Sequence, residues 1–136
     1  YRTALEHLGV RAYAKLTGSR GIQAWIPIEP GRYSYAETSA WVEKLSRAVG
    51  AAAPGLVSWE WAKADRGGRA RLDYTQNSPI KTLVAPYAVR PVASAAVSAP
   101  ITWDSTSANA LVSSSWSGAV RSVSAKGNRV LFSLAI

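Results

Sequence analysis

The most regular pattern of apolar positions predicts one long helix after residue 34. Its stripe repeats at intervals of three and four residues, the spacing of a single helix face. The stripe consists of Trp41, Leu45, Val49 and Ala52, and Val42 and Ala48 widen it. Ser34 and Glu37 precede it at the spacing of a capping box, in which each side chain accepts a hydrogen bond from the other residue's backbone N–H. We expect the helix to end near Gly50 and Trp41 to lie in the core.

Alternating and apolar runs predict strands around that helix. Residues 10–16 alternate apolar and polar positions, and residues 22–28 read IQAWIPI, so we expect two strands with the tight turn TGSRG between them. A short helix should precede them, with Thr3 and Glu6 as a second capping box and an end near Leu8. Further extended segments are expected at residues 56–61, 70–74 and 81–87.

Two helices beside several strands predict an α+β fold rather than a doubly wound one. Beyond residue 92 the sequence becomes rich in alanine and serine, and residues 105–124 hold eight serines and no acid. We therefore expect residues 1–104 to form the main folded unit. Residues 105–136 are expected to be a low-complexity segment of the same domain that ends in a helix.

Composition narrows the functional classes. The 136 residues are 48% hydrophobic, which suffices for a core, yet no apolar run approaches the roughly 18 residues of a membrane span. The lack of cysteine excludes disulfides and thiolate metal sites, and it permits a reducing, intracellular setting. His7 is the single histidine and falls in a predicted surface helix, so a His-dependent catalytic triad is excluded.

Charge points to a polyanionic partner. Sixteen Lys and Arg residues stand against eight acids, which gives a formal net charge of +8 and a pI of about 10.2. Between Lys63 and Arg90, six cations face only two acids, Asp65 and Asp73. Such clustering attracts nucleic acid or nucleotide phosphates through counterion release. Ordinary solubility charge is the alternative, and the six tryptophans can either stack on bases or pack internally.

The turn between the first two expected strands carries groups suited to phosphate. Thr17–Gly21 combines glycine backbone amides with the hydroxyl of Ser19 and the forked guanidinium of Arg20. These groups bind phosphate well. Many ordinary hairpins hold the same residue types, so this alternative stays open.

Asp73 is the second candidate. A carboxylate at the end of an expected strand can hold a divalent metal. The residues alone favour an ion pair of Asp73 with Arg71 or Arg66, because metal-assisted phosphoryl transfer needs several carboxylates together. Lys81 and Arg90 follow, and they can either neutralise a triphosphate or protect a solvated edge strand.

Four stretches in a fixed order resemble a known family. They are TGSRGIQAWIPI, GGRARLDYTQN, KTLVAPYAVR and PITWD. From about Leu5 to Asp104 the chain is similar to the polymerase domain of bacterial ligase D, a member of the archaeo-eukaryotic primase superfamily. The resemblance implies a primase-polymerase-like fold, with a mixed or antiparallel sheet flanked by helices. It also implies a DNA-dependent nucleotidyltransferase that adds nucleotides to DNA ends in non-homologous end-joining repair.

The same resemblance implies roles for individual residues. Asp73 matches a catalytic aspartate that binds manganese or magnesium. The positions that match the pocket of the incoming triphosphate are Thr17, Ser19, Arg20, Gln23, Arg66, Gln76, Lys81 and Arg90. The implied partners are DNA ends, nucleoside triphosphates, the end-binding protein Ku and a DNA ligase domain, in the bacterial cytoplasm and away from membranes.

Three departures from the family pattern keep other functions open. No Asp-x-Asp motif is present, so the chain resembles the C-terminal half of a polymerase domain and is expected to be inactive alone. Gln23 stands where many relatives carry histidine, and Gln cannot carry a proton near neutral pH. Beyond Asp104, serine, alanine and asparagine replace acids and arginines. The alternatives are a non-catalytic basic module that binds nucleic acid and an assembly domain that contacts Ku or ligase.

Overall fold

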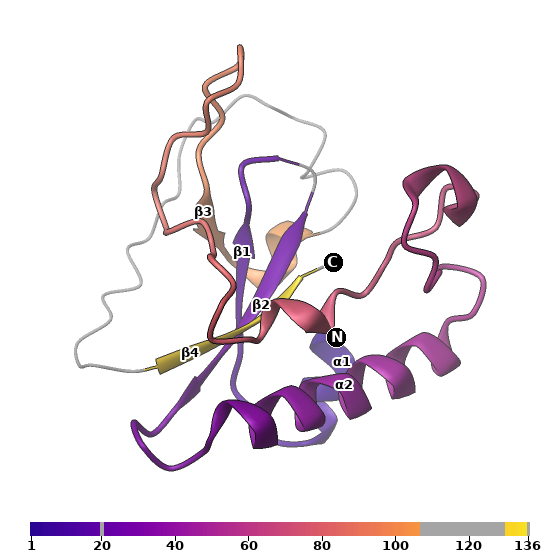
Figure 1. Ribbon diagram of the computed structural model, residues 1–136, viewed down its shortest axis with the longest axis vertical. Coiled ribbons are helices and arrows are strands. Elements are labelled where there is room, and N and C mark those ends of the chain that lie inside the picture. Colours follow the sequence, from indigo (N-terminus) through magenta and orange to yellow (C-terminus); the bar gives the residue numbers. More distant parts are fainter. Residues whose placement is uncertain (20, 107–129, 136) are drawn as a thin grey trace.

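A four-stranded antiparallel sheet forms the centre of the computed structural model (Figure 1). Strands β1 (Tyr13–Leu16) and β2 (Ile22–Ile28) form a central hairpin. Strands β3 (Ala99–Ile101) and β4 (Val130–Ala135) extend it at its two edges, in the order β3-β1-β2-β4. The structure describes residues 1–19, 21–106 and 130–135.

Two α-helices pack together at one end of the sheet, and three short 3₁₀ helices punctuate the loops. Helix α1 (Arg2–His7) lies beside the long helix α2 (Tyr35–Ala52) in Figure 1. The 3₁₀ helices are η1 (Lys63–Arg66), η2 (Tyr74–Gln76) and η3 (Trp103–Thr106). No described helix is both long and apolar enough to cross a bilayer.

The core forms where α1 and α2 meet one face of β2. Its buried side chains are Leu5, Ala24, Ile26, Val42 and Leu45. Burying a large aliphatic side chain stabilises the folded chain by about 1.5–3 kcal/mol, so these contacts fix the helices on the sheet. Because side chains alternate along a strand, Gln23 and Trp25 point to the opposite face. That opposite face is where the polar candidates of the hairpin lie.

The sequence pattern predicted α2 correctly and its buried face in part, since Val42 and Leu45 are buried while Trp41 and Ala52 are exposed. The capping box is complete, since Ser34 and Glu37 bond each other's backbone N–H groups. The buried positions of the helix are Thr38, Val42, Leu45, Ser46 and Gly50. The expected core position of Trp41 is wrong, because its side chain is 38% exposed and Val42 faces the sheet instead. Trp41 lines a groove of about 560 Å³ between α2 and β2.

The predicted cap at Thr3 and three of the predicted extended segments are wrong. Thr3 caps nothing, because α1 already begins after Tyr1. The segments at 56–61, 70–74 and 81–87 are loops rather than strands, and they contain only single bridge residues, Val57 paired with Ala70, and Asp73. Both edges of the β1–β2 hairpin pair with β3 and β4 instead.

Residues 130–135 form a strand where a C-terminal helix was expected. They pair with residues 23–28 of β2 in antiparallel register, so the helix prediction is wrong for the described part of the segment at 105–136. A short apolar run such as VLFSLA fits either element by pattern alone, and the open edge of β2 decides for the strand. Residues 107–129 lie outside the described residues. The predicted α+β class with an antiparallel sheet is confirmed.

The cap of α2 gives the first test. Ser34→Ala is expected to lower the free energy of unfolding by about 1 kcal/mol, because it removes the oxygen that accepts from the Glu37 N–H. Urea denaturation measures the change. Ser34→Asn keeps a capping oxygen and should stay within about 0.5 kcal/mol of the wild type. An equal loss in both variants would contradict the capping role.

Candidate active site

The hydroxyl of Thr17 organises the turn between β1 and β2. It donates to the carbonyl of Gly21 at 3.0 Å and accepts from the backbone N–H groups of Ser19 and Gly21 at 3.3 and 3.2 Å. Both amides are therefore engaged inside the turn, and the expected cradle of free amides for an anion is wrong for these two groups. The Ser19 side chain is exposed, and Arg20 lies outside the described residues.

Arg90 packs against this turn from a distant part of the chain. Gly18 has a φ of +69°, and a Cβ there would lie 2.8 Å from Arg90 Cγ and 2.9 Å from the backbone of Val97 and Ser98. The backbone N–H of Arg90 donates to Ala96 O at 2.8 Å, which closes a small hairpin around the arginine. Arg90 Nε is buried and has no hydrogen-bond partner among the described residues. The Arg90 side chain thus lies against the turn, and its Nε–H is still available as a hydrogen-bond donor.

Lys15 is a site residue that sequence reasoning missed. Its side chain is only 2% exposed, and its ammonium donates to Val84 O at 3.0 Å and Ser98 Oγ at 2.7 Å. The ammonium also lies 5.1 Å from the centroid of the Trp25 ring. Burial, with a further contribution from the positive charge of Arg90, lowers the pKa of Lys15 to about 8. The alternation of apolar and polar residues in this strand predicted that Lys15 faces solvent. Lys15 is buried because residues 84–98, which are distant in the sequence, pack over its side chain.

Gln23 lies directly across the hairpin from Lys15, so both side chains share the face of the sheet away from the helices. Gln23 is 4% exposed, and its amide oxygen accepts from Trp25 Nε1 at 3.2 Å. Among the predicted site residues, the structure therefore brings Thr17, Gln23 and Arg90 to the same end of the hairpin. We call this group, with Lys15, the cationic cluster.

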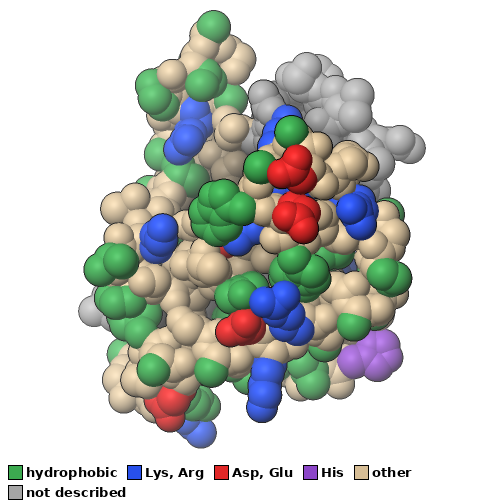
Figure 2. All heavy atoms as spheres, turned by 45° about the vertical axis from the view of Figure 1, so that its right-hand side comes forward, with side chains coloured by type: hydrophobic (Ala, Val, Ile, Leu, Met, Phe, Trp, Pro, Cys, Tyr) green, Lys and Arg blue, Asp and Glu red, His purple; other side chains and the backbone are tan. Residues whose placement is uncertain are grey.

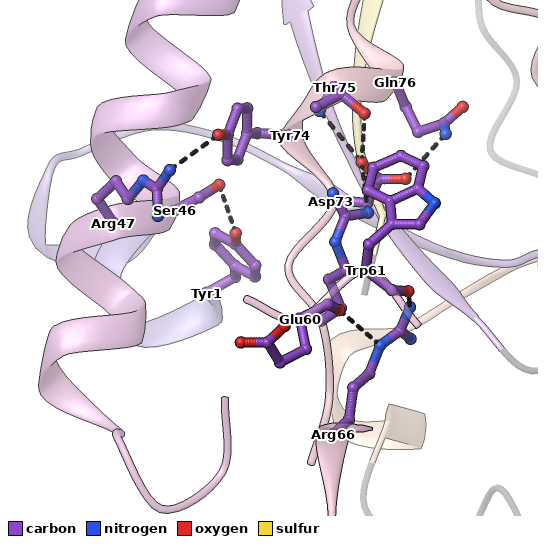
Figure 3. A network of polar contacts seen from close by, with 11 residues as sticks. Tyr1, Ser46, Arg47, Glu60, Trp61, Arg66, Asp73, Tyr74, Thr75 and Gln76 are labelled. Carbon is purple, nitrogen blue, oxygen red and sulfur yellow. Dashed lines mark hydrogen bonds and ion pairs between the residues drawn. The ribbon is translucent and has the colours of Figure 1, made fainter. Parts of the chain in front are cut away.

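Asp73 sits in a second group of contacts (Figure 3). Thr75 donates to its Oδ1 through both its hydroxyl at 2.6 Å and its backbone N–H at 3.2 Å. Gln76 donates to its Oδ2 at 2.9 Å, as predicted pocket neighbours would. Arg71 pairs with Oδ1 at 3.3 Å, and the two side chains are only 13% and 20% exposed. The ion pair foreseen as an alternative is therefore present with Arg71, as a largely buried pair.

These contacts keep the Asp73 carboxylate charged. Burial by itself would raise the pKa of Asp73, but the hydrogen bonds from Thr75 and Gln76 and the charge of Arg71 outweigh it and lower the pKa below its ordinary value. The carboxylate is thus an anion at neutral pH whose two oxygens already have partners. Any further ligand of this group has to compete with Arg71.

The described residues do not by themselves make a metal site. A divalent ion in a phosphoryl-transfer centre is held by several carboxylates. Within the described part of the chain, no three Asp, Glu, His or Cys side chains gather at one point. Asp73 fits the role of one ligand, and both of its oxygens have protein donors.

Two predicted site residues, Arg66 and Lys81, make no described contact with the cationic cluster. Arg66 donates to the backbone carbonyls of Glu60 at 3.0 Å and Trp61 at 2.6 Å, so it clamps its own loop (Figure 3). Lys81 is exposed. Among the described contacts, none links either of them, or Asp73, to the cationic cluster. The groove between α2 and β2 contains none of the predicted site residues.

Comparison with known proteins decides the family. Residues 1–128 match the family described as LigD, primase-polymerase domain. The chain belongs to the LigD primase-polymerase family. The bifunctional non-homologous end joining protein LigD of Bacillus subtilis (strain 168) is 33% identical over 99 residues, which are 73% of this chain and 16% of that protein. The multifunctional non-homologous end joining protein LigD of Mycolicibacterium smegmatis is 33% identical over 104 residues, 76% of this chain and 13% of that protein.

A solved relative confirms the primase-polymerase-like fold. It is the polymerase domain from Mycobacterium tuberculosis ligase D in complex with DNA, with a TM-score of 0.68 and 29% identity over 76% of this chain and 36% of that chain. The chain spans 16% and 13% of the two curated LigD proteins. What a whole LigD protein does is therefore a matter of proposal for this chain.

The contact of Gly18 with the Arg90 hairpin gives a second prediction. In Gly18→Ala, the left-handed φ strains the backbone by about 1–2 kcal/mol, and the new Cβ also overlaps Arg90 and the backbone at Val97 and Ser98. Gly9→Ala is the matched control, because Gly9 has a φ of +64° with nothing within 4 Å of its Cβ position. By chemical denaturation, Gly18→Ala should destabilise the chain by about 1 kcal/mol or more beyond Gly9→Ala. Equal losses would show that the hairpin does not pack on the turn.

The buried Lys15 gives a third prediction, on pH. Its folded-state pKa of about 8 lies below its ordinary value of 10.5, so the unfolded chain binds more protons between these values. Stability contributed by Lys15 therefore rises with pH through this window. The unfolding free energy of the wild type minus that of Lys15→Met should increase by about 1–3 kcal/mol between about pH 7.5 and about pH 10.5. Lys15→Arg stays charged and should show no such rise, and a flat wild-type profile would contradict the assignment.

Proposed function

We propose that this chain is the nucleotide-handling part of a LigD-type primase-polymerase, which adds nucleotides to DNA ends during non-homologous end joining. The observation that carries the proposal is Arg90, whose buried Nε has no partner in the described structure beside a turn shaped by Thr17. A buried cationic donor without a partner is costly unless a ligand satisfies it. A triphosphate supplies both the charge and the acceptor oxygens.

Lys15 strengthens this assignment. Its ammonium and the Arg90 guanidinium are close enough for the charge of one to lower the pKa of the other. The groups that bond the Lys15 ammonium, Val84 O and Ser98 Oγ, are neutral. The cationic cluster is therefore positive without a bonded carboxylate, and a bound anion would relieve the repulsion inside it.

Residue roles follow from this geometry. Arg90 would bind phosphate oxygens directly, and the exposed hydroxyl of Ser19 is available on the outer side of the turn. Lys15 would act by holding the Arg90 hairpin and by contributing charge. Gln23 would bound the site on the sheet face, where its amide is already oriented by Trp25. Asp73 would lie next to the DNA strand that is extended. It would supply one of the several carboxylates that the reaction centre requires.

The names of the relatives support the proposed partners. Curated relatives are named non-homologous end joining proteins, and the solved relative is in complex with DNA. DNA ends and nucleoside triphosphates are therefore the partners we propose for this chain. Ku and a ligase domain are proposed only as partners of a complete LigD protein.

A non-catalytic module that binds nucleic acid is the second candidate. The observation that favours it is the lack, within the described residues, of three metal-ligating side chains at one point. Such a module would bind DNA with a steep salt dependence and without any competition from nucleotide. Nucleotide binding therefore separates the two candidates.

The fourth prediction tests nucleotide binding by the 136-residue chain with a fluorescent ATP analogue. Arg90→Ala should weaken binding about 10-fold or more, since a charge-assisted hydrogen bond is worth about 1.5–3 kcal/mol. Arg32→Ala removes the same charge from an exposed ion pair with Glu29 and should leave the affinity unchanged. Inorganic tripolyphosphate should compete.

Two results would overturn the proposed function. One is an identical affinity in the Arg90→Ala and Arg32→Ala variants, and the other is a lack of competition by tripolyphosphate. Primer extension by the chain alone is expected to be undetectable, since Asp73 is one carboxylate where the reaction needs several. DNA binding that persists without nucleotide binding would establish the second candidate.

A further inference from the structure

An exposed tryptophan stands beside the Asp73 ion pair. Trp61 is 71% exposed, and the guanidinium carbon of Arg71 lies 4.1 Å from the centroid of its ring. Arg71 in turn pairs with Asp73 at 3.3 Å. Ring, guanidinium and carboxylate thus follow one another in direct contact. Figure 3 shows Trp61, Asp73 and Gln76 on one side of the network, away from Tyr74 and α2.

Trp59, two residues before Trp61, contacts α2 in a way that Trp61 does not. Trp59 is 37% exposed and packs against α2, because the guanidinium of Arg47 lies 4.3 Å from its ring centroid and the ring also meets Gly50. Arg47 donates to the hydroxyl of Tyr74 at 3.0 Å, so this group joins the loop to α2. Among the described contacts, none joins the Trp61 ring to a helix. Arg71 lies over the ring, and most of the Trp61 surface is exposed to solvent.

The backbone that carries the exposed ring is nevertheless held in place, and Arg71 packs on the ring itself. Arg66 bonds the backbone carbonyl of Trp61 and that of the residue before it. The loop is closed further by hydrogen bonds from Ser58 N to Ala70 O at 2.8 Å and from Ala70 N to Leu56 O at 2.9 Å. A ring that is fixed before binding loses little conformational entropy when a flat partner stacks on it.

Positive charge near the ring favours a partner with phosphates. Residues 60–73 contain the four cations Lys63, Arg66, Arg69 and Arg71 against the three acids Glu60, Asp65 and Asp73, and Asp73 is already paired with Arg71. The side of the molecule that carries this segment comes forward in Figure 2, where large hydrophobic side chains lie among Lys and Arg with acids between them. Flat rings next to cations are the surface that single-stranded nucleic acid uses, with bases on the rings and phosphates on the cations.

We propose that Trp61, backed by Arg71, is the stacking platform for an unpaired base of the DNA strand, beside Asp73. The proposal rests on the proposed function, because it places the strand next to the carboxylate assigned to the reaction. A free nucleotide is the less favoured occupant, since its phosphates belong to the cationic cluster and no described contact joins that cluster to Trp61.

The fifth prediction uses fluorescence anisotropy of the 136-residue chain with a labelled single-stranded 12-mer. Trp61→Ala should weaken binding about 5- to 100-fold, the loss expected for one stacked base. Trp61→Phe should retain most of the affinity. Tyr33→Ala is the matched control, because Tyr33 is also an exposed ring, 47% exposed, beside an arginine, and its loss should change the affinity less than about 2-fold.

An abasic strand of equal charge separates stacking from structural damage. Wild type should bind it as weakly as Trp61→Ala does, while Trp61→Ala should bind normal and abasic strands alike. Binding of the fluorescent ATP analogue should be unchanged in Trp61→Ala. This readout distinguishes the proposal from the proposed function, which Arg90→Ala tests.

Three results would overturn the platform. The first is no single-strand binding by the wild type, and the second is an equal loss of normal and abasic strand affinity in Trp61→Ala. The third is a loss of nucleotide affinity with unchanged DNA affinity, which would assign the ring to the free nucleotide.

Discussion

The buried ammonium of Lys15 is the interaction on which the arrangement of the cationic cluster depends. It bonds a carbonyl at Val84 and a hydroxyl at Ser98, so it ties strand β1 to both ends of the segment that carries Arg90. Burying an ion is unfavourable unless its donors are satisfied, and the groups bonded to this ammonium are neutral. The fold thereby keeps the positive charge of Lys15 near that of Arg90, whose charge contributes to the lowered pKa of Lys15.

The two groups of polar residues differ in their charge balance. In the cationic cluster, the positive charges of Lys15 and Arg90 have no bonded carboxylate among the described contacts. Around Asp73, by contrast, the carboxylate is neutralised by Arg71 and satisfied by Thr75 and Gln76. The first group therefore carries unpaired positive charge, and the carboxylate of the second is neutralised by the arginine.

Local signals predicted the parts of the structure that local interactions determine. The bounds of β2 and the cap of α2 could be read from IQAWIPI and from Ser34 with Glu37, and the bond between Asp73 and Gln76 joins residues of one short motif. The strand β4, the pairing of β3 with β1 and the burial of Lys15 could not be predicted, because each depends on a partner far away in the sequence. Arg66 fits the family motif, yet its guanidinium donates to the backbone carbonyls of Glu60 and Trp61. The sequence alone does not show which acceptors lie within reach of this side chain.

The order of strands in the sheet has a consequence for how the chain acquires its structure during synthesis. The central hairpin is synthesised before the strands on its two edges, which follow about 75 and 100 residues later. Until then both edges of the hairpin are open to pairing with other chains. Such distant pairings form slowly, so we expect the nascent polypeptide to be most prone to aggregation in the interval before β4 is made.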